Sequence, residues 1–237
     1  MRRDFHRWFS PSLGRDMELL VFGHAGAPVL AFPTSMGRFY EYEDFGMVGA
    51  LSEHLERGWI QLFCPDGIDG ESWYNRSIHP HDRALRHNQY ERYLLGEVVP
   101  LIRQVNSNGF LMTTGASFGA YHAVNLAFKH PDLFSRVVAL SGQYDLAFLL
   151  RGYMDEDCYF NSPMTYLPNL ADHRYLAAMR DHLQIILCAG GWSDICHQGT
   201  IDLSAVLRNK GIPHTLDIWD QAWHDWPWWR QMTQKHI

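Results

Sequence analysis

Ser117 lies in the pentapeptide Gly-Ala-Ser-Phe-Gly, the pattern in this sequence most able to do chemistry. An apolar run precedes it and an alanine-rich helical pattern follows, which predicts a strand, a sharp turn and a helix. Gly115 and Gly119 lack a Cβ, so strand and helix can pass close beside a serine in a strained conformation. Such a nucleophile elbow holds the hydroxyl above a sheet. The alternative is a plain Gly/Ser-rich turn, because a lone G-x-S-x-G motif has low specificity.

A histidine base must remove the proton of the serine, and a carboxylate must orient that histidine. In elbow architectures the chain order is serine, acid, histidine, each after a strand. Of the 14 histidines, His224 follows the last predicted strand and directly precedes the terminal helix, so it is the predicted base. The alternative is a histidine at a helix entry, with Asp225 as N-cap and Pro227 in the first turn.

Asp194 is the predicted acid, because it lies in the loop after the predicted strand 184–189. Its alternative role is to cap the helix that begins near residue 197. Asp145 is the competitor, since it lies beyond the strand that ends at Leu140, where some hydrolases of this architecture place the acid. The sequence favours Asp194 and leaves Asp145 open.

Backbone amides must also stabilise the oxyanion of a tetrahedral intermediate. The amide of Phe118, the residue after the serine, is one predicted donor. The loop 34–37 is expected to supply the second, with Met36 preferred and Ser35 next. Several aromatic side chains are predicted to line the substrate site, with simple packing as the alternative: Trp73, Tyr74, Trp192, Trp223 and Trp226.

Strands and helices alternate along the chain after a predicted antiparallel hairpin in residues 1–24. This order predicts one α/β domain over residues 1–237, with a mostly parallel sheet of about eight strands and helices on both faces. Residues 143–181 form a long irregular connection or small cap, which we expect above the active site. Further strands are predicted at 28–32, 59–64, 109–116, 135–140, 184–189 and 214–219, and helices at 41–57, 82–106 with a kink at Pro100, 118–128, 197–209 and 227–235.

The amino-acid composition indicates which binding partners and which cellular compartment to expect. The 237 residues carry a net charge of −6 and no Lys/Arg block, which argues against nucleic acid and anionic membranes as partners. The N-terminal residues lack the apolar core of a signal peptide, and the four cysteines follow no disulfide or metal spacing, so a cytoplasmic protein with reduced thiols is expected. The segment His79-Pro-His-Asp82 could suggest a metal site, but a solvated loop is favoured. A homodimer is a general expectation for an enzyme of this kind.

Five segments match a known family: GRFYEYEDFGM at 37–47, DGESWY at 69–74, GASFGAYHA at 115–123, YFNSPMTYLPNL at 159–170 and HDWPWWR at 224–230. On these segments the chain resembles the putative esterase family of α/β-hydrolases, which includes S-formylglutathione hydrolases, feruloyl esterases, enterochelin esterases and mycolyltransferases. The resemblance implies an eight-stranded sheet, a Ser-acid-His triad, no metal and no cofactor. The loop GGWSD at 190–194 departs from the family pattern, which leaves the acid less defined.

The combined expectation is a serine carboxylic-ester hydrolase that acts through an acyl-enzyme on short-chain or aryl esters of small molecules. Ser117 would be the nucleophile, His224 the base and Asp194 its orienting acid. Three alternatives stay open at this point. The same triad could transfer the acyl group to an alcohol, it could cleave amides, or the scaffold could be a non-catalytic binding protein.

Overall fold

Eight strands form one sheet: β1 (Arg3–Ser10), β2 (Arg15–Phe22), β3 (Ala27–Phe32), β4 (Ile60–Pro65), β5 (Met112–Ala116), β6 (Arg136–Leu140), β7 (Gln184–Gly190) and β8 (Thr215–Trp219). The computed structural model describes residues 1–237, and its strand order is β1-β2-β4-β3-β5-β6-β7-β8. β1 and β2 form the predicted antiparallel hairpin, and β2 also pairs antiparallel with β4. All other neighbours pair in parallel. The predicted α/β-hydrolase sheet with an antiparallel start is confirmed.

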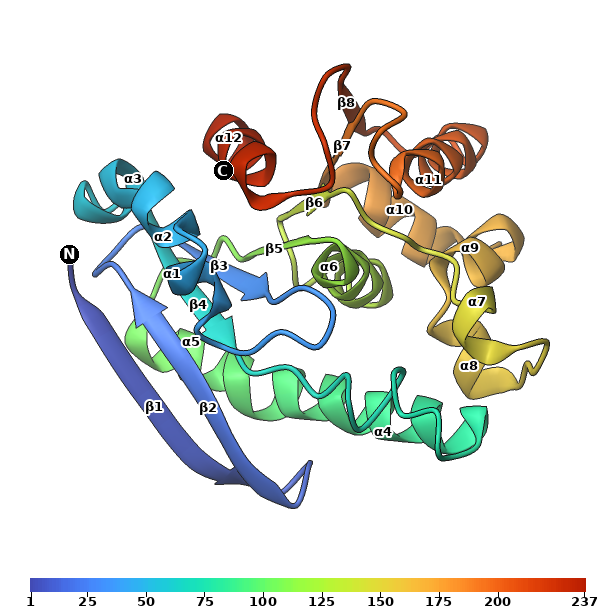
Figure 1. The fold of residues 1–237 in the computed structure, drawn as a ribbon, viewed down its shortest axis with the longest axis horizontal. Coiled ribbons are helices and arrows are strands. Elements are labelled where there is room, and N and C mark those ends of the chain that lie inside the picture. The colour runs from blue at the N-terminus through green and yellow to red at the C-terminus, as the bar shows by residue number, and fades with distance from the viewer.

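Helices cover both faces of this sheet (Figure 1). One face carries α4 (Pro80–Tyr93), α5 (Val99–Val105), α6 (Phe118–Lys129) and α11 (His197–Asn209), and the other carries α1 (Glu41–Asp44), α2 (Met47–Ala50), α3 (Ser52–Glu56) and α12 (Trp226–His236). Because both faces are covered, the central strands are mostly apolar, and every residue of β4 and β5 is buried.

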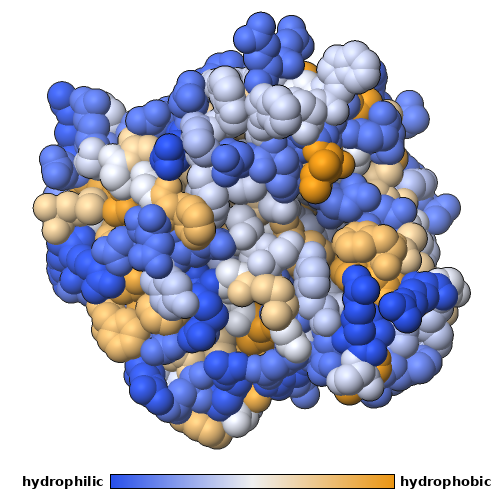
Figure 2. Space-filling view, in the orientation of Figure 1, coloured by the Kyte–Doolittle hydropathy of each residue, from blue (hydrophilic) through white to orange (hydrophobic).

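The outer surface in the same view is mainly hydrophilic, with apolar side chains in separate patches (Figure 2). None of the helices combines the length and the apolar character needed to cross a membrane.

The single amphipathic helix predicted over 41–57 is wrong, because the structure has the three short helices α1, α2 and α3 there. Gly46 follows α1 with φ +74°, a left-handed conformation that ends a right-handed helix. Val48, Leu51 and Leu55 are buried in the core. Phe45 instead points outward and stacks on Trp226, with ring centroids 5.0 Å apart.

The long helix predicted over 82–106 is likewise divided. α4 ends at Tyr93, a π-helical turn, η1 (Leu94–Val98), follows, and α5 begins at Val99. Pro100 lies in the first turn of α5, where a missing N–H removes no helical hydrogen bond. The wider π-helical turn directly before α5 accommodates Pro100, which would otherwise kink a continuous α-helix.

Residues 143–181 contain four short helices and one 3₁₀ turn where the sequence suggested an irregular connection. The helices are α7 (Ala147–Leu150), α8 (Glu156–Phe160), α9 (Pro163–Tyr166) and α10 (His173–Asp181), and the turn is η2 (Leu167–Asn169). α8 contacts α4, while α9 contacts α6 and α11. In Figure 1 these elements lie on the side of the molecule away from the blue hairpin. That the segment caps the active site stays a prediction.

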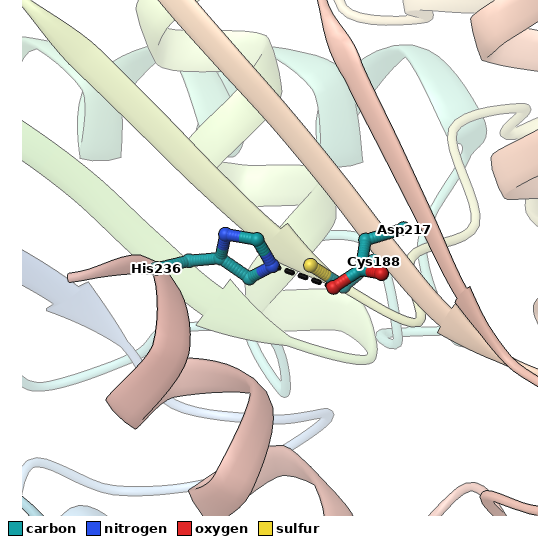
Figure 3. Close-up of side chains that lie close together, drawn as sticks. All are labelled: Cys188, Asp217 and His236. Carbon is teal, nitrogen blue, oxygen red and sulfur yellow. Dashed lines mark hydrogen bonds and ion pairs between the residues drawn. The ribbon is translucent and has the colours of Figure 1, made fainter.

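The end of α12 is held to the edge strand β8 by Asp217. Figure 3 shows His236 reaching from α12 to the Asp217 carboxylate, beside the buried thiol of Cys188 on β7. The same carboxylate oxygen accepts three hydrogen bonds, from Lys235 Nζ (2.7 Å), His236 Nε2 (2.7 Å) and Trp219 Nε1 (2.9 Å). Burial alone would raise the pKa of Asp217, but these hydrogen bonds outweigh it and lower the pKa to about 2.

This depressed pKa predicts a pH-dependent contribution to stability. An unfolded aspartate titrates at about 3.9, so the ionised Asp217 stabilises the fold above about pH 4, and the contribution is lost as the pH falls towards 2. We expect Asp217→Asn to lower the free energy of unfolding by about 1 kcal/mol near neutral pH, and by less at about pH 3. Urea unfolding of both proteins across this range measures the difference. An equal deficit at every pH would contradict the electrostatic explanation.

Candidate active site

Ser117 lies at the tip of a tight turn between β5 and α6. Its backbone angles, φ 56° and ψ −123°, are strained for a residue with a side chain. A Cβ on Gly115 would lie 2.3 Å from the backbone of Gly119, and a Cβ on Gly119 would lie 2.5 Å from the carbonyl oxygen of Pro33. Both glycines are therefore required, and the loop after β3 packs directly against the first turn of α6.

Three side chains from three loops form one hydrogen-bonded chain. His224 Nε2 lies 3.0 Å from Ser117 Oγ, and His224 Nδ1 lies 2.9 Å from Asp194 Oδ1. The Asp194 side chain is completely buried, and that of His224 is 17% exposed. With Asp194 ionised, Nδ1 carries the ring proton and donates it to the carboxylate, which leaves Nε2 as acceptor for the serine hydroxyl. The structure thus brings the three predicted residues together with the geometry of a Ser-His-Asp triad.

Contacts between two neighbouring loops bring the acid and the base together. A Cβ on Gly190, at the end of β7, would lie 2.1 Å from the carbonyl oxygen of Ala222, so the loop after β7 packs directly on the loop after β8. Ser193 Oγ donates to the same carbonyl at 3.1 Å. Asp225 then caps α12 by accepting the N–H of Trp226 at 2.7 Å, as expected from the sequence. The base is therefore held between a loop contact and a capped helix start.

Asp194 accepts hydrogen bonds at both carboxylate oxygens. Oδ2 accepts from the Gly190 amide at 2.9 Å and from the Ser141 hydroxyl, and Oδ1 accepts from the Cys196 amide at 2.8 Å as well as from His224. Burial would raise the pKa of Asp194, but these hydrogen bonds, led by that of His224, outweigh it and lower the pKa to about 2. The acid is therefore ionised at neutral pH.

The competing acid, Asp145, has a different contact. Its Oδ1 accepts the amide N–H of Ala147, two residues further along the chain, at 2.9 Å. The structure pairs His224 with Asp194 instead, in the loop where the sequence departs from the family pattern.

Two residues behind the acid were not predicted from the sequence. The buried Ser141 hydroxyl donates to Asp194 and accepts from Trp229 Nε1 at 3.0 Å. The Trp229 ring also lies edge-on to the ring of His224, with centroids 4.9 Å apart. Ser141 has φ +51°, a second strained residue in the site. Trp229 lies in the segment HDWPWWR at 224–230 and Ser141 directly follows β6, but neither local pattern identifies a contact partner.

The structure corrects the choice of Met36 as second oxyanion donor. The Met36 amide donates to Asp69 Oδ2 at 3.0 Å and is therefore occupied. The Ser35 amide, the next candidate, has no acceptor within the protein. The Phe118 amide lies in the first turn of α6, where helical N–H groups have no partner in the helix. Ser35 and Phe118 are thus the two candidate donors whose amides have no acceptor in the protein.

Two of the aromatic residues predicted to contact substrate are buried elsewhere. Trp73 is completely buried among apolar side chains such as Tyr121 and Leu146, so its prediction as a substrate contact is wrong. Trp226 is buried against Phe45. Their size and apolar surface serve packing, the alternative that the sequence left open.

Of the other aromatic candidates, Tyr74 contacts Phe118, whereas Trp192 and Trp223 are exposed. The Tyr74 ring lies edge-on to Phe118 with centroids 5.1 Å apart, and its hydroxyl is 2.8 Å from Ser35 Oγ. Trp192 is 90% exposed and Trp223 is 62% exposed, and each stands close in sequence to a member of the triad. Both indole rings therefore belong to the loops that carry Asp194 and His224, and both are largely exposed.

A cavity of about 390 Å³ lies away from the triad, at the other end of α6. Its lining includes Lys129, Tyr166 and Tyr175, and none of the triad residues. The volume of a cavity therefore does not identify the catalytic site in this protein.

Three groups of side chains have metal-ligand types within 4.8 Å of one another: Cys188, Asp217 and His236; Asp194, Cys196 and His224; and His81, Asp155 and Asp157. In each group a carboxylate already pairs with a histidine. Lys235 adds a positive charge to the first group, which disfavours a cation there. Hydrogen bonding within the protein therefore accounts for all three groups.

The sequence matches the model of a family described as putative esterase over residues 10–237. The chain belongs to the putative esterase family. The resemblance inferred from the sequence is thereby confirmed, and the protein is a serine esterase. No curated protein matches the sequence.

Solved structures similar to this esterase share its fold across nearly the whole chain. A ferulic acid esterase is 18% identical with a TM-score of 0.79, covering 99% of this chain and 95% of its own. S-formylglutathione hydrolase from Staphylococcus aureus is 16% identical with a TM-score of 0.74, covering 99% and 94%. Fluorophosphonate-binding serine hydrolase F from the same organism is 17% identical with a TM-score of 0.72, covering 99% and 96%. At these identities the similarity establishes the fold.

Proposed function

We propose that this esterase hydrolyses carboxylic esters through an acyl-enzyme formed on Ser117. The observation that carries the proposal is the unbroken hydrogen-bonded chain from Ser117 Oγ through the His224 ring to the buried, ionised Asp194. A serine hydroxyl becomes an effective nucleophile when a correctly oriented imidazole accepts its proton.

In the first half-reaction, His224 Nε2 takes the proton of Ser117 as Oγ attacks the ester carbonyl carbon. The carbonyl becomes a tetrahedral oxyanion, which the amides of Phe118 and Ser35 stabilise. Asp194 orients the ring and stabilises the imidazolium. His224 then gives the proton to the departing alcohol oxygen as the carbon–oxygen bond breaks. In the second half-reaction water gives a proton to His224 and attacks the acyl carbon. The bond between the acyl carbon and Ser117 Oγ then breaks, His224 returns the proton to Oγ, and the acid is released.

Short-chain or aryl esters are the proposed substrates. Tyr74 beside the oxyanion donors and the exposed Trp192 and Trp223 offer aromatic surface for a flat acyl or alcohol group. A ferulic acid esterase and an S-formylglutathione hydrolase are among the similar structures, which supports this choice.

A single domain in the cytoplasm is the setting that we propose for this activity. One sheet includes strands from both ends of the chain, which supports one domain over residues 1–237. Four free, buried cysteines support a reducing compartment. The net charge of −6 supports a small-molecule ester, rather than nucleic acid, as the partner. A homodimer stays a prediction.

A panel of p-nitrophenyl and aryl esters tests the proposal and separates it from its rivals. Hydrolysis should dominate in water. An added alcohol acceptor would reveal an acyltransferase by forming a new ester in preference to the free acid. Matched anilides would reveal an amidase if they turned over as fast as the esters. No turnover of any ester would favour a binding protein.

Reaction with an organophosphonate provides a second prediction. We expect one adduct per chain, on the peptide that carries Ser117, because the triad activates this hydroxyl alone. Mass spectrometry of the digested adduct locates the label. The exposed Ser107, in the loop after α5, serves as an internal control and should stay unmodified. A label on any other residue, or labelling of Ser117→Ala, would count against Ser117 as the nucleophile.

A further inference from the structure

Three consecutive amides follow β3 in the loop 33–40, and two of them are occupied by carboxylates. The Thr34 amide donates to Glu41 Oε2 at 2.6 Å, and the Met36 amide donates to Asp69 Oδ2 at 3.0 Å. The amide between them, that of Ser35, has no acceptor in the protein. The Ser35 N–H is therefore flanked on both sides by an amide that a carboxylate holds.

Glu41 is a buried residue in α1, and both oxygens of its carboxylate accept hydrogen bonds from this loop. Its second oxygen, Oε1, accepts the hydroxyl of Thr34 at 2.7 Å. A Cβ on Gly37 would lie 2.7 Å from the Glu41 oxygens, so the carboxylate packs directly under the turn. Burial raises the pKa of Glu41, and the two hydrogen bonds from Thr34 oppose that rise. A carboxylate is costly to bury unless it is hydrogen-bonded, which points to a specific use for this one.

Asp69 connects the other side of the loop to the helix that follows the nucleophile. Its Oδ1 lies 2.9 Å from Nε2 of His122, and both side chains are buried. His122 lies one helical turn after Phe118 on α6. The Met36 amide is thereby tied, through Asp69 and His122, to the same helix whose first amide faces the site.

Met36 needs such a restraint because its φ of +62° is a left-handed conformation that disfavours a side chain. The loop also lies where an oxyanion donor is needed. Pro33 packs on the first turn of α6, and the Ser35 hydroxyl contacts Tyr74, whose ring rests on Phe118. The Ser35 N–H belongs to the peptide plane between those of the Thr34 and Met36 amides, so loss of either carboxylate contact would let that plane rotate and turn the Ser35 N–H away.

We propose that Glu41 and Asp69, the latter held by His122, are positioning residues that aim the Ser35 amide as the second oxyanion donor. This inference rests on the proposed acyl-enzyme mechanism. It assigns a role in catalysis to two carboxylates and a histidine that do not belong to the triad. Their contribution acts on the oxyanion of the transition state and leaves ester binding largely unchanged.

Alanine substitutions at the two carboxylates test the proposal. We expect Asp69→Ala and Glu41→Ala each to lower kcat for p-nitrophenyl acetate about 10- to 100-fold with KM within about threefold, since loss of a whole oxyanion donor costs roughly 10²- to 10³-fold. The inhibition constant of an aryl trifluoromethyl ketone, which forms an oxyanion on the serine, should rise by the factor by which kcat/KM falls. Asp69→Asn and Glu41→Gln keep a carbonyl oxygen as acceptor and should retain most of the activity.

Glu91→Ala is the matched control. It removes another carboxylate–histidine pair, Glu91 with His130 at 2.8 Å, at the far end of α6, and should lower stability without changing kcat. Complete organophosphonate labelling of each variant shows that the fold and the nucleophile are intact.

A wild-type kcat in fully labelled Asp69→Ala and Glu41→Ala, or a change in KM alone, overturns the inference. Should the alanine variants fail to fold, the amide variants decide, because a large loss of kcat in fully labelled Asp69→Asn and Glu41→Gln also overturns it and near-normal rates support it. Failure of the underlying mechanism gives a different result, namely an active Ser117→Ala.

Discussion

Replacing Ser117 by alanine is expected to lower kcat/KM for aryl esters by at least about 10⁴-fold. The substitution removes the only oxygen that His224 Nε2 contacts in the site, so no acyl-enzyme can form. The acid, the base and the free amides stay in place, and a small residual rate from oxyanion stabilisation of direct water attack is the most that should remain. Initial rates on a p-nitrophenyl ester measure the loss.

Two controls separate a chemical loss from a structural one. Ser107→Ala alters an exposed serine in the loop after α5 and should leave the rate unchanged. Thermal unfolding of Ser117→Ala should be close to that of the wild type, or slightly altered by the strained backbone at the turn. Undiminished ester turnover in Ser117→Ala would contradict the proposed acyl-enzyme mechanism.

Asp194→Asn is expected to lower kcat by roughly 10²- to 10⁴-fold. An asparagine has one acceptor oxygen where the native carboxylate has two, and its NH₂ group must face either His224 or Ser141. Facing His224, it can hydrogen-bond only to an unprotonated Nδ1, which leaves the proton on Nε2. Nε2 then points a hydrogen at Ser117 and cannot act as the base.

Asp145→Asn is the matched control, because Asp145 is the other acid that the sequence allowed. Its carboxylate accepts the Ala147 amide N–H, and an asparagine oxygen can accept the same group, so activity should stay near the wild-type level. Rates for both variants at one ester concentration well above KM are sufficient. If Asp194→Asn kept the wild-type rate while Asp145→Asn lost most of it, the assignment of Asp194 as the catalytic acid would be wrong.

Much of the architecture could be predicted because it depends on local patterns. Apolar runs of strand length alternate with helical patterns, and the glycines around Ser117 announce a turn too tight for other residues. The end of a parallel strand is also a predictable place for a functional group. Asp194 and His224 were found in this way, from their order and their loops, and the structure places both within hydrogen-bonding distance of one another.

The remaining parts depend on contacts between segments that are distant in the chain. Asp69 occupies the Met36 amide from 33 residues away, so no pattern around Met36 could show that its N–H is taken. Ser141 and Trp229 meet behind the acid across 88 residues. The prediction of one helix over 41–57 was wrong for a local reason. The spacing of apolar residues contains no information on the left-handed conformation of Gly46, which ends the first short helix. The prediction for Trp73 was wrong because large aromatic residues occur both in protein cores and in binding sites, and the sequence pattern around them does not distinguish the two.

The left-handed backbone conformations have a consequence for how this protein can be changed. Four residues with side chains have positive φ: Met36, Ser117, Ser141 and Arg151. Three of them belong to the nucleophile, to the support of the acid and to the oxyanion loop. Glycine would relieve the strain at each, so a search for thermostable variants that ranks positions by backbone energy would choose these three early. Selection for stability and selection for turnover therefore compete at the same few positions, and Arg151 is the one strained position open to improvement without touching the site.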